Sequence, residues 1–344
     1  MTRPPDLARS PDRDSLLARP DRDDFAQLAP DFGRRFLLVV DTEEEFDWLA
    51  PFSRANRSVT ALGGMARGQA YFTQAGVRPL WVTDWPVADH PQAGAMMAQW
   101  VADGVADVGA HLHPWVNPPD LEAVNAANSF AGSLPEEWER QKLTLLRDRI
   151  AEVTGVAPIA YRAGRYGIGP NSGRILHDLG FRVDTSVRSR FDYRAQHGPD
   201  FSAMPIRPWR AGPERALLEL PLSTAHCGPL APIGDRLTPL LERKGLAAGA
   251  LSRLRLLERI PLTPEDVPLS AALRAIDALI AEDARLLMFS FHSPTLEPGC
   301  GLYVKNESQL IDFYRWWDGV LDHLAVRGVT PAGLHDVLSA ASRG

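Results

Sequence analysis

Carboxylate and imidazole side chains stand at two places in the sequence with a spacing that suits metal binding and proton transfer. In Asp41-Thr-Glu43 the carboxylates are two residues apart, so on an extended chain both point to one face. Such a pair can supply a metal ligand and a general base. The alternative for this acidic stretch, which continues to Asp47, is a solvated turn after a strand.

The second place is His111-Leu-His113. Both imidazoles project from one face of an extended chain, which makes them a chelating pair for zinc or a similar ion. Together with one carboxylate they would leave coordination positions open, as a catalytic metal requires. The alternative is a pair of histidines that only pack in the core or at its rim.

Two later segments carry groups for the rest of a hydrolytic site. Tyr161-Arg162-Ala-Gly-Arg-Tyr166-Gly places arginines in a glycine-containing loop after a strand, where they can orient a carboxylate or an oxyanion. His292 ends the apolar run that starts at Phe289, a position that suits a general acid. The alternatives are surface arginines at a turn and a buried structural histidine.

The elements that position these residues alternate between strands and helices, which is typical of βα units around a parallel sheet. Polar residues follow most of the six or seven expected strands, at the end where such folds place their chemistry. A helix is expected to begin at the capping-box pair Ser133 and Glu136. The expected strands cover 36–40, 79–83, 105–113, 158–162, 181–184, 217–221 and 286–292.

Composition sets limits on the class of protein. The 344 residues suit two domains or one α/β barrel with insertions. The net charge of −6 argues against a nucleic-acid partner. With no apolar leader and no apolar run long enough for a membrane span, we expect a cytoplasmic protein. Phosphate-binding loops, dinucleotide fingerprints and nucleophile elbows are missing from the sequence.

The order of these motifs resembles the polysaccharide deacetylase family, built on the nodulation-type deacetylase homology domain. The Gly-Ala-His-x-His-Pro-Trp form of the histidine motif is similar to that of one branch of the family. The resemblance spans roughly residues 36–340. The matching segments are Val40-Asp-Thr-Glu43, Gly109-Ala-His-Leu-His-Pro114, Tyr161–Gly167, Gly180-Phe-Arg-Val-Asp-Thr-Ser186, Leu218-Glu-Leu-Pro-Leu222 and Phe289-Ser-Phe-His292.

The resemblance implies an α/β fold, a distorted (β/α)7-type barrel of parallel strands with loop and helix insertions. One such domain would cover 35–344, with insertions near 187–215 and 226–268, after a loosely ordered N-terminal arm over 1–34. It also implies a divalent metal ion, with zinc preferred. The implied activity is that of a hydrolase that removes acetyl groups from a saccharide, with N-deacetylation favoured over O-deacetylation. The implied roles are Asp41 as base, Glu43, His111 and His113 as metal ligands, Arg162 as tether of Asp41, an oxyanion-binding amide near Tyr166, His292 as acid, and Asp184 as an orienting or charge-balancing group.

The acetylated saccharide is the expected partner, and three other features bear on partners. Trp85, Trp115 and Trp209 stand in expected loops where they could stack on sugars or simply pack. A basic amphipathic segment, Arg236–Arg259, could cover a core or a dimer interface, and an anionic membrane surface is the less favoured alternative. An anionic glycan could contact the arginines of the first insertion, which are Arg188, Arg190, Arg194, Arg207 and Arg210.

The same residues are also compatible with two other functions. One is a different C–N hydrolase on this scaffold that acts on a small amide or imide. The other is a glycan-binding protein without catalysis.

Overall fold

The computed structural model describes residues 13–48, 50–243, 251 and 253–343, and a sheet of nine strands organises them. Its order is β10-β1-β2-β3-β4-β5-β7-β6, with β11 beside β1. Each of these ladders is parallel except β6–β7, and β8 and β9 form a separate antiparallel pair. The strands are β1 (Arg34–Thr42), β2 (Leu80–Thr83), β3 (Asp107–Leu112), β4 (Ala160–Ala163), β5 (Val183–Asp184), β6 (Trp209–Ala211), β7 (Leu217–Glu219), β8 (Thr224–Cys227), β9 (Glu258–Pro261), β10 (Leu286–His292) and β11 (Val329–Pro331).

Strand β1 is buried on both faces, as its unbroken apolar run predicts. Leu37 and Val39 pack in one cluster with Leu80 of β2. Leu38 packs in another cluster, which is shared with the surrounding helices. Successive side chains of a strand point to opposite faces. Asp41 therefore continues the face of Leu37 and Val39, which is the inner face of the curved sheet.

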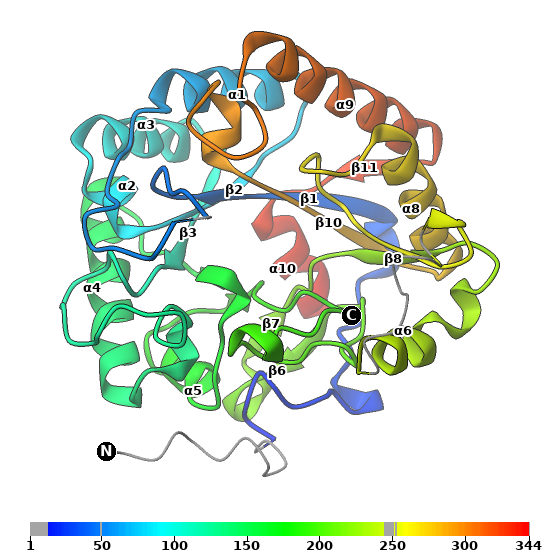
Figure 1. Cartoon of the computed structure of the whole chain (residues 1–344), viewed down its shortest axis with the longest axis horizontal. Coiled ribbons are helices and arrows are strands. Elements are labelled where there is room, and N and C mark those ends of the chain that lie inside the picture. Colours follow the sequence, from blue (N-terminus) through cyan, green and yellow to red (C-terminus); the bar gives the residue numbers. More distant parts are fainter. Residues whose placement is uncertain (1–12, 49, 244–250, 252, 344) are drawn as a thin grey trace.

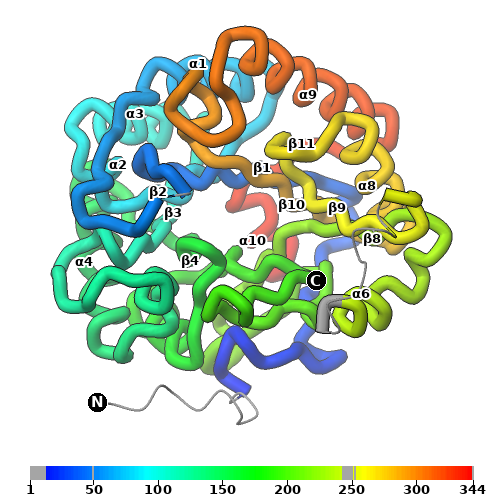
Figure 2. Tube along the Cα trace, viewed as in Figure 1, coloured from blue at the N-terminus to red at the C-terminus, as the bar shows by residue number. Residues whose placement is uncertain are grey.

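The sheet curves until its two ends approach each other (Figures 1 and 2). Beyond β7, the amide of Ser223 donates to the carbonyl of Met288 in β10 at 3.3 Å, and the Met288 amide donates to Ser223 Oγ at 2.9 Å. The amide of Ser290 donates to the carbonyl of Leu262 at 3.2 Å. Irregular segments thus join the two ends, and the fold is the predicted distorted (β/α) barrel.

Helices surround the sheet, and α10 lies against the end at which the strands begin (Figure 1). Leu334 and Val337 of α10 pack with Leu37 inside the barrel, and the Leu334 amide donates to Asp107 at the start of β3 at 3.1 Å. The polar strand ends lie at the opposite end. The helices are α1 (Leu62–Gln74), α2 (Trp85–Asp89), α3 (Pro91–Ala102), α4 (Glu136–Thr154), α5 (Ser172–Asp178), α6 (Gly234–Arg243), α8 (Leu269–Ala281), α9 (Glu307–Val326) and α10 (Leu334–Arg343).

The start of α4 differs from the predicted capping box. Pro135 is the N-cap residue and no side chain caps the helix. Ser133 instead ends a separate turn of 3-10 helix, Ala131–Ser133, so it stands too early in the chain to cap α4.

The N-terminal arm and the basic segment fall partly outside the described residues. Of the N-terminal arm, residues 1–12 are not described, and within 13–34 the side chains of Leu16 and Phe32 are buried. Of the basic segment Arg236–Arg259, residues 244–250 and 252 are not described, and its last residues belong to strand β9, not to a helix. Among the described residues, no helix is long and apolar enough to cross a membrane.

Candidate active site

The carboxyl ends of neighbouring strands bring the predicted side chains together. Asp41 of β1 is the register partner of His292 of β10, and His111 of β3 is the register partner of Arg162 of β4. Because parallel strands end at the same edge, residues far apart in sequence meet there. The site is therefore a direct consequence of the strand order.

Glu43, His111 and His113 form a compact group of possible ligand atoms, and all three are buried. The Oε2 atom of Glu43 lies 3.6 Å from Nε2 of His111 and 3.4 Å from Nε2 of His113. Ligands at ordinary zinc distances in a tetrahedral shell are about 3.4 Å apart. The spacing of this group therefore fits a divalent metal.

Hydrogen bonds at the other ring nitrogen orient both imidazoles. Nδ1 of His111 lies 3.0 Å from the carbonyl oxygen of Arg162, which can only accept, and Nδ1 of His113 lies 2.8 Å from Oε2 of Glu44. With the proton on Nδ1, each Nε2 keeps the lone pair that a metal needs. Among the described residues, the buried Nε2 of His113 has no hydrogen-bond partner. This donor set suits zinc.

Burial controls the protonation of these ligands. It raises the pKa of Glu43 well above its ordinary value and lowers the pKa of His111 well below its own. It also lowers the pKa of His113 to about 4. Both imidazoles are therefore neutral at neutral pH, which is the form that binds metals. A cation in the group would favour the ionised form of Glu43.

Glu44, which the sequence does not single out, orients His113 through the contact at Nδ1, the ring nitrogen that faces away from the proposed metal. Trp115 donates from Nε1 to Glu44 Oε1 at 2.9 Å and stacks on the His113 ring at 4.4 Å between centroids. The Glu44 amide donates to Asp84 Oδ2 at 2.8 Å. Burial raises the pKa of Glu44 to about 8 and that of Asp84 well above its ordinary value. Trp115 and Trp209 are each 1% exposed, so neither ring is available to stack on a sugar.

Arg162 holds Asp41 at the centre of the site. Its Nη1 donates to Asp41 Oδ1, while Nε and Nη2 donate to the carbonyl and hydroxyl oxygens of Thr185, both at 3.1 Å. The Arg162 side chain is fully buried. The second carboxylate oxygen of Asp41, Oδ2, lies 3.8 Å from Nε2 of His292. Asp41 therefore has one oxygen fixed by a cation and the other beside an imidazole.

Glu265 holds His292, although the sequence gives no signal for this residue. Its Oε2 lies 2.7 Å from Nδ1 of His292, and its Oε1 accepts from the His292 amide at 2.9 Å. Burial lowers the pKa of His292, but the carboxylates of Glu265, Glu43 and Asp41 outweigh it and raise the pKa to about 10. His292 is therefore protonated at neutral pH.

Asp184 and Tyr166 have different surroundings. Asp184 accepts from the hydroxyl and amide of Ser186 at 2.7 and 3.2 Å, and among the described residues no hydrogen bond or ion pair joins it to Asp41. Tyr166 and Arg165 have positive φ values of 62° and 56°, an uncommon backbone that clusters at functional sites. Tyr166 lines a cavity together with His292. Asp184 does not line that cavity, and its hydrogen bonds run to Ser186 instead.

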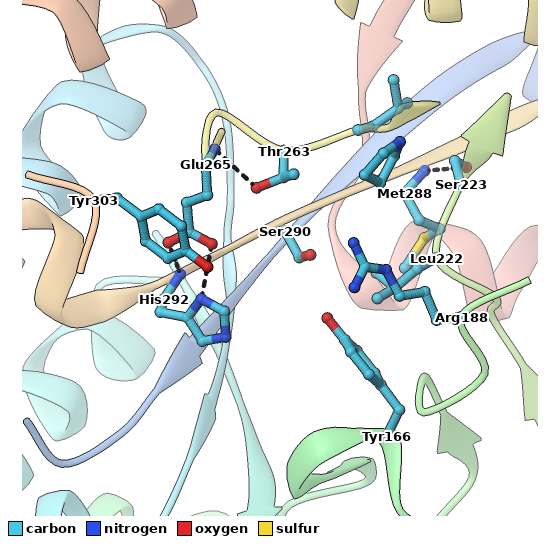
Figure 3. Close-up of a pocket in the computed structure, with 12 residues that line it drawn as sticks. Tyr166, Arg188, Leu222, Ser223, Thr263, Glu265, Met288, Ser290, His292 and Tyr303 are labelled. Carbon is cyan, nitrogen blue, oxygen red and sulfur yellow. Dashed lines mark hydrogen bonds and ion pairs between the residues drawn. The ribbon is translucent and has the colours of Figure 1, made fainter. Parts of the chain in front are cut away.

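That cavity has a volume of about 70 Å³ and lies beside His292 (Figure 3). Tyr303 stacks on the His292 ring with 6.3 Å between centroids and 14° between planes. The cavity is lined by Tyr166, Arg188, Leu222, Ser223, Pro261, Leu262, Thr263, Glu265, Met288, Ser290, His292 and Tyr303.

Comparison with known proteins finds likeness in solved structures alone. No protein-family model and no curated protein matches the sequence. A putative polysaccharide deacetylase from Mycobacterium smegmatis is 16% identical, with a TM-score of 0.46 over 90% of this chain and 96% of that one. A peptidoglycan N-acetylglucosamine deacetylase is 9% identical, with a TM-score of 0.46 over 91% of both chains. A CE4 family pseudoenzyme from Bacillus anthracis is 9% identical, with a TM-score of 0.42 over 89% of this chain and 66% of that one.

Proposed function

We propose that this protein hydrolyses the acetamido group of an acetylated sugar, with a divalent metal, preferably zinc, held by Glu43, His111 and His113. One observation carries the proposal. An arginine-held carboxylate, Asp41, and a protonated imidazole, His292, face each other at 3.8 Å beside a group of ligand atoms with metal spacing. A base and an acid that can both reach one reacting amide group are what its hydrolysis requires.

Asp41 is the general base of the proposed reaction. Its Oδ1 is occupied by Arg162, which leaves Oδ2 to remove a proton from the attacking water. Arg162 touches no reacting atom in this scheme. It positions Asp41 by a charge-assisted hydrogen bond.

His292 is the general acid. The nitrogen of an amide leaves as an amine only after it gains a proton, and the raised pKa of about 10 keeps that proton available on His292 at neutral pH. Glu265 fixes Nδ1 and so turns Nε2 toward Asp41. A leaving amine must be protonated by the acid, and His292 keeps a proton for this step at neutral pH. The raised pKa of His292 therefore favours nitrogen over oxygen as the leaving atom.

When bound, the metal would supply Lewis-acid polarisation of the acyl carbonyl. The ligand atoms are Glu43 Oε2 and the Nε2 atoms of His111 and His113, which leave coordination positions for substrate and water. A backbone amide at the strained turn near Tyr166 is the proposed second donor to the oxyanion. The order of the sequence motifs supports the same chemistry.

Metal content tests the proposal most directly. We expect wild-type protein to hold about one equivalent of a divalent metal and His113→Ala to lose it. His335→Ala, which changes an exposed histidine of α10, is the matched control and should retain the metal. Release of acetate from N-acetylated glycans is then the activity assay. Wild-type protein that binds no metal when supplied with it would contradict the proposal.

The small volume of the cavity favours one second candidate, hydrolysis of a small cyclic amide or imide. The same base and acid would serve that reaction. Activity on such a compound, with no acetate released from any acetylated sugar, would establish it instead.

A further inference from the structure

The segment 187–215 holds six arginines, and the structure separates Arg188 from the other five. The other five are engaged outside the cavity at His292, and among them Arg215 pairs with Asp24. Arg190 pairs with Asp235 and Glu282, Arg194 with Asp192 and Asp200, Arg207 lies over the ring of Phe25, and Arg210 donates to the carbonyl of Ala341. Arg188 lines the cavity.

Arg188 is a partly buried cation that no carboxylate pairs with among the described residues. Its Nη1 donates to the hydroxyl of Tyr193 at 3.0 Å, and its guanidinium lies 5.3 Å from the ring centre of Tyr166 and 4.1 Å from that of Phe191. A guanidinium has five N–H donors and stays charged at every physiological pH. Most of these donors are therefore available to a ligand.

The fold holds Arg188 in place. Its backbone forms a parallel bridge with Leu222, and Val187 before it donates to Glu219 at 3.2 Å. Figure 3 shows the Arg188 guanidinium turned toward the same space as the hydroxyls of Tyr166 and Ser290, with His292 across it. These groups can all donate hydrogen bonds.

One carboxylate lines this cavity, that of Glu265, and its oxygens are occupied. Oε1 accepts from the His292 amide and from Thr295 Oγ1 at 2.9 and 2.7 Å, and Oε2 faces His292 Nδ1 at 2.7 Å. The nearby Asp41 is paired with Arg162. The side of the cavity near Arg188 therefore presents a cation and hydroxyl donors.

We propose that Arg188, with the hydroxyls of Tyr166 and Ser290, binds a carboxylate of the substrate, so that the sugar carries an anionic group near its acetamido group. A planar carboxylate matches the two parallel N–H bonds that a guanidinium offers, and its size suits a cavity of about 70 Å³. This inference rests on the proposed deacetylase function for the identity of the rest of the ligand. It narrows the substrate class to acidic acetamido sugars.

The test compares two sugars that differ at one carbon, N-acetylglucosaminuronic acid with a carboxylate at C6 and N-acetylglucosamine with a hydroxymethyl group there. We expect metal-loaded wild-type protein to bind the acid about 10- to 100-fold more tightly in calorimetric titrations. Arg188→Met should remove that preference, Arg188→Lys should keep part of it, and the neutral sugar should bind all variants alike. Arg207→Met is the matched control from the same segment, and it should keep the full preference.

Equal affinity of the two sugars for wild-type protein, including no measurable binding of either, would overturn the carboxylate subsite. So would an unchanged preference in Arg188→Met. The failure of the proposed function looks different. Charge-dependent binding without acetate release would retain the subsite and reject the deacetylase, whereas acetate release without charge preference would do the reverse.

Discussion

Two histidine–glutamate pairs lie in this site and share nearly the same hydrogen bond. Nδ1 of His113 is 2.8 Å from Glu44, and Nδ1 of His292 is 2.7 Å from Glu265. The pKa values nevertheless move in opposite directions, to about 4 for His113 and to about 10 for His292. A hydrogen-bonded carboxylate alone therefore does not decide whether a histidine is charged.

Burial and the charges around each ring explain the difference. Three carboxyl groups lie within 4.0 Å of His113, but burial outweighs the attraction to carboxylates there, and the charges of His292 and Arg165 lower the pKa of His113 further. The side chains of His113 and Glu44 are both fully buried, and burial raises the pKa of Glu44 itself to about 8. Burial thus disfavours charge on both partners. The His292 side chain is 24% exposed, and three carboxylates act on it, so attraction outweighs burial. In the proposed reaction, one residue type thereby serves as a neutral ligand just after β3, at His113, and as a proton donor at the end of β10, at His292.

The largest predicted effect comes from removing the proton donor. We expect His292→Ala to lower the rate of acetate release about 10²- to 10⁴-fold, the usual range for one acid–base group. Metal content should stay at the wild-type level because His292 is not among the proposed ligands. The two measurements are single-substrate kinetics and metal analysis. Loss of metal in this variant would place His292 with the ligands and remove the contrast between the two histidines.

Glu44→Gln should weaken metal binding about 10- to 100-fold, the effect expected for a residue that orients a ligand. The amide keeps the shape but cannot ionise, and it can turn an N–H toward Nδ1 of His113, so it no longer fixes which ring nitrogen carries the proton. Competition with a chromogenic chelator measures the affinity. Glu45→Gln is the neighbouring control, since Glu45 accepts from the Ala61 amide at 2.7 Å and stands outside this network. Equal losses in both variants would contradict the role of Glu44.

Glu265→Gln should shift the alkaline limb of the pH–rate profile to lower pH. The acid must be protonated to act, so activity falls as the pH rises through the pKa of His292, about 10 in the wild type. Removing one adjacent negative charge lowers that pKa by about 1–3 units. Activity at high pH is then lost first. Thr295→Val, which removes a donor to Glu265 and leaves its charge, is the control. An unchanged alkaline limb would show that another group carries the proton.

The sequence could predict the residues at strand ends because alternating strand and helix patterns indicate parallel strands, whose carboxyl ends lie at one edge of the sheet. Asp41, His111 and His292 each stand where an apolar run stops, and parallel strands bring such ends together. Glu43 follows Asp41 by the two-residue period of a strand. Pattern alone therefore indicates a parallel α/β fold with these side chains at one edge of the sheet, whereas the barrel is expected from the family resemblance.

The residues that contact the two histidines could not be predicted from the sequence, because they follow no strand or helix periodicity. Glu44 stands one position past Glu43, where strand geometry predicts the opposite face, but β1 has ended at Thr42 and the chain turns Glu44 inward. Glu265 lies in the irregular segment between β9 and α8. For Trp115, the sequence cannot distinguish a ring that binds sugar from one that packs on His113.

Glu139 of α4 extends the comparison to a buried carboxylate outside the site with no histidine beside it. Burial raises its pKa to about 8, despite a hydrogen bond from Ser172. Between its unfolded value of 4.5 and about 8 the folded state binds more protons than the unfolded state, so stability falls as the pH rises.

We expect that fall to be about 1.4 kcal/mol between pH 6 and pH 7 for this one group. Glu139→Gln removes it, so the difference in unfolding free energy between variant and wild type should grow in favour of the variant over that interval. Urea unfolding at the two pH values measures it, with Glu137→Gln on the exposed side of α4 as control. A constant difference between the two pH values would mean that Glu139 is ionised in the folded protein. Burial would then be insufficient to neutralise a carboxylate beside the charge of Arg140, and the explanation given for Glu44 and His113 would need a second cause.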